Sequence, residues 1–208
     1  MRDSLERGVP TLEEAKLLLE EGQRLFPGPW IDHSIYAGKA AELIARKCID
    51  LDPDIALVLG MLHDIGDRYG NTYMKHILHG YNFAMEKGYN KLAKICLTHS
   101  FNCHDISSSF GRWDYFSQEE YDFVKKYIES VEYDDYDRLI QLCDALALPS
   151  GFCLMEKRMV DVALRHGIHE HIIDKWKATF ETKQYYEEKM GISIYSVLPG
   201  VIENTFEL

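Results

Sequence analysis

The chain has 208 residues, of which 46% are hydrophobic and 27% are charged, a composition typical of a globular protein with one well-buried core. Its formal net charge of -11 at pH 7 argues against extended contact with a nucleic-acid polymer or an anionic membrane surface. A small anionic substrate is not excluded by this charge, because bound cations can invert the electrostatic field at a site.

The cysteines and the N-terminal residues indicate the compartment. The five cysteines form no C-x-x-C pair, and most of them lie in apolar runs: Cys48, Cys96, Cys103, Cys143 and Cys153. Buried free thiols of this kind predict a reducing, cytoplasmic location. Residues 1–7 lack the apolar core of a signal peptide. The longest apolar stretch, 55–62, is too short to span a bilayer.

Capping residues predict where the first helices begin. Thr11 with Glu14 has the pattern of a capping box, and the helix that it opens is expected to run to about Leu25, where a Phe-Pro-Gly-Pro breaker follows. Asp32 is predicted to cap the second helix. The apolar face of that helix has a period near 3.6 and includes His33.

The remaining segments are also helical in pattern. Asp52-Pro53 is expected to open a helix that runs into His63 and stops at Gly66, before a polar loop at 67–71. Further helices are predicted at about 73–87, 91–99, 117–130, 136–148, 153–165 and 169–189.

The fold class follows from these elements. The sequence contains no alternating strand run, no internal repeat and no linker long enough to divide it. It therefore predicts an all-α, single-domain helical bundle over residues 1–208, with a core at about 30–150 and C-terminal helices at 151–208 packed on it. The longest irregular stretch, 100–116, is suited to a loop over a site.

Four ionisable residues are candidates for metal ligands. His63 and Asp64 follow an apolar helical run and offer two kinds of ligand from adjacent positions, while His33 and Asp144 lie on the apolar faces of their own predicted helices. Burial of such groups without partners costs on the order of a few kcal/mol or more. Convergence on a shared cation removes that cost. Imidazole and carboxylate ligands suit divalent first-row metals, and the lack of cysteine among them argues against a closed structural zinc site.

The order of these ligands resembles the HD superfamily of metal-dependent phosphohydrolases, which is an all-helical family. Its minimal ligand set is a His, an adjacent His-Asp pair and a distal Asp, and the matching residues within 30–150 are His33, His63, Asp64 and Asp144. Two further histidines mark the dinuclear branch of that family. His76 heads an H-x-x-x-G segment, and His99 ends a short helix. His79, one turn beyond His76, stays open as an alternative ligand or as a support for one.

Within that branch the chain resembles the bacterial proteins of the YqeK type, which hydrolyse diadenosine tetraphosphate symmetrically. The likeness lies in segments 63–68, 76–80 and 141–146. The chain departs from these proteins at Asp67, where they often have Lys, and at 100–104, where it lacks their Arg. A group that handles phosphate is therefore missing or relocated.

The resemblance implies two bound divalent metals and a metal-activated water. The implied ligands are His33, His63 and Asp144 for one metal, His76 and His99 for the other, and Asp64 between them. Iron is the favoured metal, with Mn, Zn, Co, Ni and Mg as alternatives. The implied catalytic residues are Asp64, Asp67 and Arg68, with Asp67 or His104 as a proton relay. The candidate phosphate-binding and substrate-binding residues are Arg68, Lys75, His104 and Arg112.

Several functions stay open at this level. The alternatives to a dinuclear phosphohydrolase are a mononuclear HD nucleoside monophosphatase, a di-iron HD oxygenase that cleaves C–C or C–P bonds, and a non-catalytic nucleotide sensor. The expected partner is a small-molecule nucleotide, with no nucleic-acid polymer and no membrane. The aromatic C-terminal helix leaves room for a homodimer.

Overall fold

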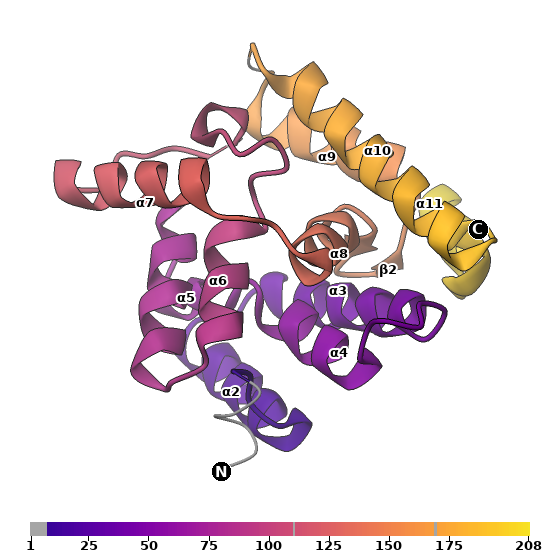
Figure 1. The fold of residues 1–208 in the computed structure, drawn as a ribbon, viewed down its shortest axis with the longest axis horizontal. Helices are drawn as coiled ribbons and strands as arrows, with labels where there is room; N and C mark the ends of the chain where they lie inside the picture. The colour runs from indigo at the N-terminus through magenta and orange to yellow at the C-terminus, as the bar shows by residue number, and fades with distance from the viewer. Residues whose placement is uncertain (1–7, 110, 169) are drawn as a thin grey trace.

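A computed structural model describes residues 8–109, 111–168 and 170–208, and the regular secondary structure of this part is helical except for one short hairpin (Figure 1). The α-helices are α2 (Leu12–Leu25), α3 (Trp30–Ala45), α4 (Pro53–Leu62), α5 (Lys75–Glu86), α6 (Asn90–Thr98), α7 (Gln118–Ser130), α8 (Asp135–Asp144), α9 (Met155–His166), α10 (Ile172–Met190) and α11 (Val201–Phe206). The 3-10 segments are η1 (Ile65–Tyr69), η2 (Ile106–Ser108) and η3 (Ile194–Val197). The predicted all-α fold class is confirmed.

The helix starts follow the capping signals with one exception. Thr11 and Glu14 form the predicted capping box of α2, and the Asp52 side chain accepts the first free N–H groups of α4. The predicted cap at Asp32 is wrong, because α3 begins two residues earlier, at Trp30, and Asp32 lies in its first turn. Pro29 precedes the helix with φ already at -67°, and this ring-fixed angle lets the helix start there.

The end of α8 also differs from the prediction. The helix stops at Asp144 instead of Leu148, because strands β1 (Ala147–Leu148) and β2 (Gly151–Phe152) pair as an antiparallel hairpin. Strands of two residues are too short to show an alternating pattern in the sequence. The predicted start of the last long helix, His169, lies outside the described residues; α10 begins at Ile172.

A close contact between α3 and α4 brings the first two histidines together. A Cβ atom on Gly60 would lie 2.6 Å from the Cα of Gly38, so each position admits only glycine without a shift of the backbone. The pair of helices crosses at this point, with His33 on one and His63 just beyond the end of the other. The glycine contact therefore sets the spacing of two candidate ligands.

A second close contact joins η1, α5 and α6. A Cβ on Gly66 would overlap the carbonyl oxygen of His76, and a Cβ on Gly80 would lie 2.9 Å from the Sγ of Cys96. These contacts explain the H-x-x-x-G spacing, because Gly80 lies on the same face of α5 as His76 and one turn further along. They hold His76 against the turn that carries Asp64.

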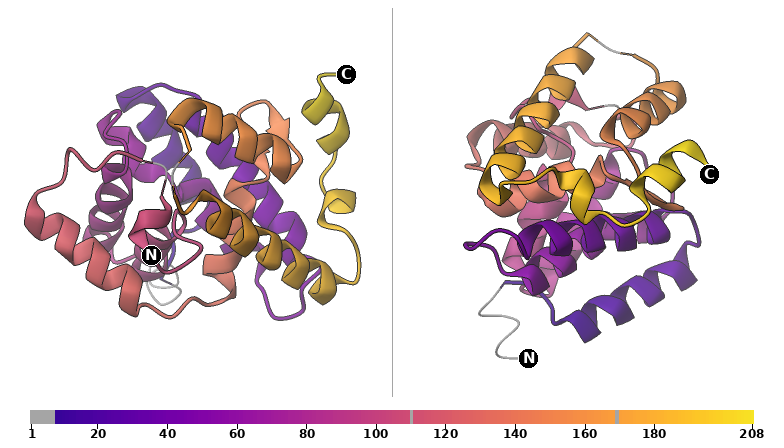
Figure 2. Two further views of the ribbon diagram at one scale, coloured as in Figure 1. Left: turned by 90° about the horizontal axis from the view of Figure 1, so that it is seen from above. Right: turned by 90° about the vertical axis from the view of Figure 1, so that its right-hand side faces the viewer.

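The C-terminal helices lie on one side of the bundle (Figure 2). Helix α10 packs on α8, and α11 packs on β2. Among the described residues, no helix is long and apolar enough to cross a membrane. Four of the cysteines are buried free thiols, as predicted, whereas Cys103 is only partly buried.

Candidate metal centre

The candidate ligands lie at or near the ends of helices. His33 is in the first turn of α3, His63 follows the last residue of α4, and Asp64 precedes η1. His99 follows the last residue of α6, and Asp144 is the last residue of α8. His33, His63 and His99 are each no more than 5% exposed. Helix ends from four separate segments of the chain thus meet at one site.

Backbone carbonyls fix the orientation of all four imidazoles. The Nδ1–carbonyl distances are 3.1 Å for His33 to Ala147, 2.7 Å for His63 to Gly60, 2.6 Å for His76 to Tyr73 and 3.2 Å for His99 to Ile95. A carbonyl oxygen only accepts hydrogen bonds, so Nδ1 must be the protonated nitrogen in each ring. The lone pair of each neutral ring therefore lies on Nε2, as in metal-bound histidines.

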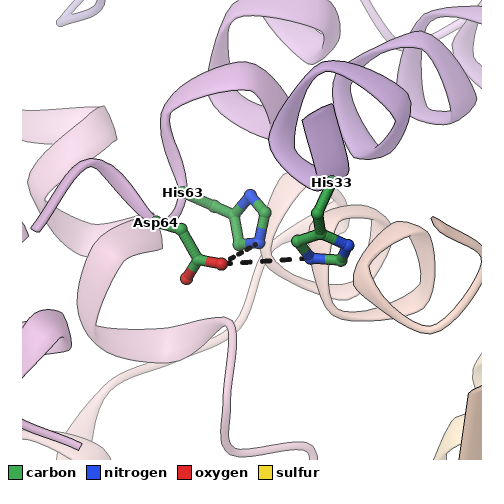
Figure 3. Close-up of side chains that lie close together, drawn as sticks. All are labelled: His33, His63 and Asp64. Carbon is green, nitrogen blue, oxygen red and sulfur yellow. Dashed lines mark ion pairs between the residues drawn. The ribbon is translucent and has the colours of Figure 1, made fainter. Parts of the chain in front are cut away.

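The four Nε2 atoms meet the carboxylate of Asp64 in two pairs. Oδ2 of Asp64 lies 3.2 Å from His63 and 3.9 Å from His33 (Figure 3), and Oδ1 lies 3.2 Å from His99 and 3.4 Å from His76. Asp64 thus joins two potential ligand groups, one with His33 and His63 and the other with His76 and His99. Oδ1 of Asp144 lies 3.1 Å from Nε2 of His33 and extends the first group.

Cations fit both groups. The Nε2 atoms of His33 and His63 are buried, and although Asp144 and Asp64 have oxygens 3.1 Å and 3.2 Å away, neither nitrogen meets them in hydrogen-bonding geometry. The Nε2 atoms of His76 and His99 lie 3.3 Å apart, so two lone pairs face each other when both Nδ1 atoms carry the proton. A divalent metal in each group would be coordinated by these nitrogens and by Asp64, and the nitrogen and oxygen donors suit Fe, Mn, Zn or Co.

A sequence model of the HD domain matches residues 30–148, which is more than half of the chain. The chain belongs to the HD domain family. Members of this family are metal-dependent hydrolases, and the His/Asp groups described above could hold metal ions. Searches of curated proteins and of solved structures find no match.

His79 lies outside the two potential ligand groups around Asp64. Its Nδ1 is 3.5 Å from the hydroxyl of Thr72, and its ring contacts that of Tyr69 at 5.2 Å between centroids. Of the two histidines on α5, His76 is therefore the one that faces Asp64.

Charges in the cluster stabilise one another against the effect of burial. Burial acts to raise the pKa of Asp64, but the adjacent His63 outweighs it and holds the pKa of Asp64 well below its usual range. His33 has the same effect on Asp144. Burial acts to lower the pKa of His63 and His76, but the nearby carboxylates, chiefly Asp64, outweigh it and raise the pKa of both to about 9.

These shifts predict that metal uptake by the metal-free protein releases about two protons per chain near pH 7. His63 and His76, with pKa values of about 9, bind a proton at that pH, whereas a metal ligand must be neutral. Titration with Zn²⁺ or Mn²⁺ in weakly buffered solution containing a pH indicator measures the release. A titration that binds metal at pH 7 without releasing protons would contradict the raised pKa values.

The same shifts set the sign of the pH dependence of stability in the metal-free protein. The folded-state pKa of His63 and of His76 is about 9, above the ordinary value of 6.5. Their contribution to stability is therefore complete below pH 6.5 and is lost as the pH rises through about 9. The melting temperature of the metal-free protein should fall as the pH rises from 6.5 to about 9. The metal-loaded protein should show no such fall.

A cavity of about 560 Å³ opens at the candidate metal centre. Asp64 and Asp144 line it together with Asp67, whose pKa burial raises to about 6. One wall is apolar and aromatic, formed by residues 26–30 with Tyr73 and Met74. Another part of the lining comes from α9 and α10 and is basic, with Arg158, Arg165 and Lys175; burial lowers the pKa of His166 beside them.

The predicted substrate-binding residues lie elsewhere. The Arg68 guanidinium pairs with Glu21 at 2.8 Å and packs on the ring of Phe83, and the Lys75 ammonium pairs with Glu120 at 2.9 Å. Arg112 is paired with Asp114, and the His104 ring stacks on Tyr133. The structure brings Asp67 to the cavity but does not bring Arg68, Lys75, His104 or Arg112 there.

The basic wall was missed by reasoning from the sequence. Arg158 and Arg165 are seven residues apart on α9 with Val162 between them, so all three share one face of the helix and all three line the cavity. This spacing is the feature of the sequence that indicates a shared helix face for the two arginines. The wall lies outside the segment that matches the HD domain, since that match ends at residue 148.

Proposed function

We propose that the protein is a dinuclear metal-dependent phosphohydrolase that cleaves a phosphoanhydride of a nucleotide. Symmetrical hydrolysis of diadenosine tetraphosphate to ADP is the reaction to test first. One observation carries the proposal: four imidazole nitrogens, each with its other nitrogen on a backbone carbonyl, converge in two pairs on the two oxygens of Asp64.

The ligand groups and Asp67 account for the chemistry. Divalent metals bound there would ionise a water molecule near neutral pH and neutralise the charge that builds on the phosphoryl oxygens. The water oxygen forms a bond to phosphorus, the bond from phosphorus to the bridging oxygen breaks, and the leaving oxygen gains a proton. Asp67 lines the cavity with a pKa of about 6, so its carboxyl group exchanges a proton near neutral pH.

The shape and charge of the cavity support a nucleotide as the substrate. The apolar wall at 26–30 and the ring of Tyr73 offer a surface for a nucleobase. The basic wall on α9 and α10 lines the same cavity, where it can pair with phosphate oxygens that carry negative charge. Arg158, Arg165 and Lys175 gather on this part of the cavity in a protein whose formal net charge is -11, and Asp161 pairs with both arginines.

The proposal predicts close to two metals per chain on protein purified without chelator. It also predicts release of ADP from diadenosine tetraphosphate by the same sample, in air and under anaerobic conditions alike. Elemental analysis measures the metals, and chromatography of the nucleotides measures the products. His99→Ala should retain about one metal per chain, because it removes a ligand from only one group.

Each alternative gives a different outcome of the same measurement. One metal per chain with activity on nucleoside monophosphates alone would make the protein a mononuclear nucleotidase. Turnover that requires oxygen would make it a di-iron oxygenase. Nucleotide binding without turnover would make it a sensor.

A further inference from the structure

A second, smaller cavity lies beside the metal centre. It has a volume of about 80 Å³ and shares His99, Asp144 and Lys175 with the main cavity, so the two spaces adjoin. Asn102 and Trp176 line this inner cavity but not the main one. The volume of the inner cavity is several times the space of about 10–15 Å³ that one water molecule needs, so the cavity has room for a few waters or for one tetrahedral oxyanion.

Two residues that line the inner cavity each carry a buried N–H donor without an acceptor. Asn102 Nδ2 and Trp176 Nε1 are both buried, and neither has a hydrogen-bond partner. An indole nitrogen only donates, so rotation or a change of protonation state cannot satisfy it. Buried donors without acceptors are rare in folded proteins because they cost stability. Two of them on one small cavity therefore point to an acceptor-rich ligand.

Positive charge borders the same space. The Arg158 guanidinium lies 3.4 Å from Oδ1 of Asp144, at the junction of the two cavities. The Lys175 ammonium donates to the carbonyl of Ser100 at 2.9 Å and also lines both cavities. Two positively charged side chains and two residues with unpaired N–H donors thus lie next to the candidate ligands Asp144 and His99. This combination suits an oxyanion.

We propose that the inner cavity binds the phosphoryl group next to the one that is hydrolysed, so that the protein selects phosphoanhydrides over simple phosphate monoesters. The inference rests on the proposed function, since it requires a phosphoryl group beside Asp64. Asn102 and Trp176 donate to the oxygens of the second group, and Arg158 and Lys175 balance its charge. The basic residue that is missing from 100–104 is thereby replaced from α9 and α10.

Two non-hydrolysable probes test the proposal by calorimetry on the metal-loaded protein. Methylphosphonate presents one phosphoryl-like group, and methylenediphosphonate presents two. Trp176→Phe removes the indole donor but keeps an aromatic ring, and Asn102→Asp replaces a donor with a negative charge. Each variant should weaken binding of the diphosphonate about tenfold more than binding of the monophosphonate. Trp113→Phe is the matched control, because Trp113 packs on Phe116 and lines neither cavity.

The outcomes separate this inference from the proposed function. Equal weakening of both probes, or unchanged binding of both in the two folded variants, overturns the role of the inner cavity. Inorganic phosphate that binds to protein saturated with methylphosphonate, and no longer binds in Asn102→Asp, would make free phosphate the occupant and overturn the substrate assignment. Failure of the proposed function is distinct, since the wild-type protein would then release no ADP from diadenosine tetraphosphate, whatever the binding of the two probes.

Discussion

Asp64→Asn should abolish metal binding and reduce kcat/KM for phosphate hydrolysis by at least about 1000-fold. The asparagine keeps the shape of the side chain but loses the charge that both histidine pairs face, at distances of 3.2 to 3.9 Å. Removal of a ligand that belongs to one group, such as His99, should affect one metal. Asp64 belongs to both groups, so its replacement should affect both metals. Elemental analysis and initial rates at saturating metal measure the two effects.

The control for this variant is Asp122→Asn on α7. Asp122 is exposed and accepts a hydrogen bond only from the nearby Gln118 among the described contacts, so metal content and rate should stay at the wild-type level. The far-UV circular dichroism of both variants should match that of the wild type. Asp64→Asn protein that retains two metals per chain would refute the assignment of Asp64 as the shared ligand.

Gly66→Ala should lower the free energy of unfolding by about 3 kcal/mol. The new Cβ would overlap the carbonyl oxygen of His76 and lie 2.6 Å from the backbone nitrogen of Gly80. Backbone atoms cannot rotate away, so η1 must move from α5, and this motion also separates Asp64 from His76. Urea denaturation of the metal-free variant measures the loss without the contribution of bound metal.

Gly80→Ala provides a graded comparison. Its nearest obstacle is the Sγ of Cys96 at 2.9 Å, which is a side-chain atom and can change rotamer. The loss of stability should therefore be smaller than in Gly66→Ala. Equal stability of Gly66→Ala and the wild type would show that η1 and α5 are not packed as closely as the structure has them.

The candidate ligands could be predicted from the sequence because ionisable residues within apolar patterns are unusual. His63 and Asp64 interrupt an apolar run, and His33 lies on an apolar face, so each needed a partner inside the protein. The resemblance to the HD superfamily then indicated which metal each residue would bind. What the pattern could not provide was the state of each ring, since the Nδ1 acceptors are backbone carbonyls that carry no mark in the sequence.

The role expected for Arg68 shows where sequence proximity misleads. Arg68 follows Asp64 by four residues, and on an α-helix the two would share a face. The intervening segment is a 3-10 turn, with three residues per turn, so Asp67 comes to lie on the side of Asp64 and Arg68 points elsewhere. The guanidinium reaches Glu21 on α2 instead, away from the cavity.

The basic wall could not be placed from the sequence for a different reason. Arg158 and Lys175 reach the cavity only because α9 and α10 fold back beside α8, and this arrangement depends on contacts between distant segments. Charged residues on exposed helices are common, so their types alone do not distinguish a phosphate-binding wall from a solvated surface. The seven-residue spacing of Arg158 and Arg165 becomes informative only once the cavity is known.

The carbonyl acceptors behind the four histidines have a consequence for the evolution of this protein. Peptide oxygens are present whatever side chain a residue carries, so substitutions at Ala147, Gly60 or Ile95 cannot delete the groups that orient the rings. Tyr73 differs, because it holds its carbonyl toward His76 from a left-handed backbone with φ of 51°. Substitutions at Ala147 and Ile95 should therefore leave the acceptors in place, whereas the contact with Gly38 restricts position 60 to glycine and Tyr73 tolerates chiefly Gly, Asn or Asp as replacements.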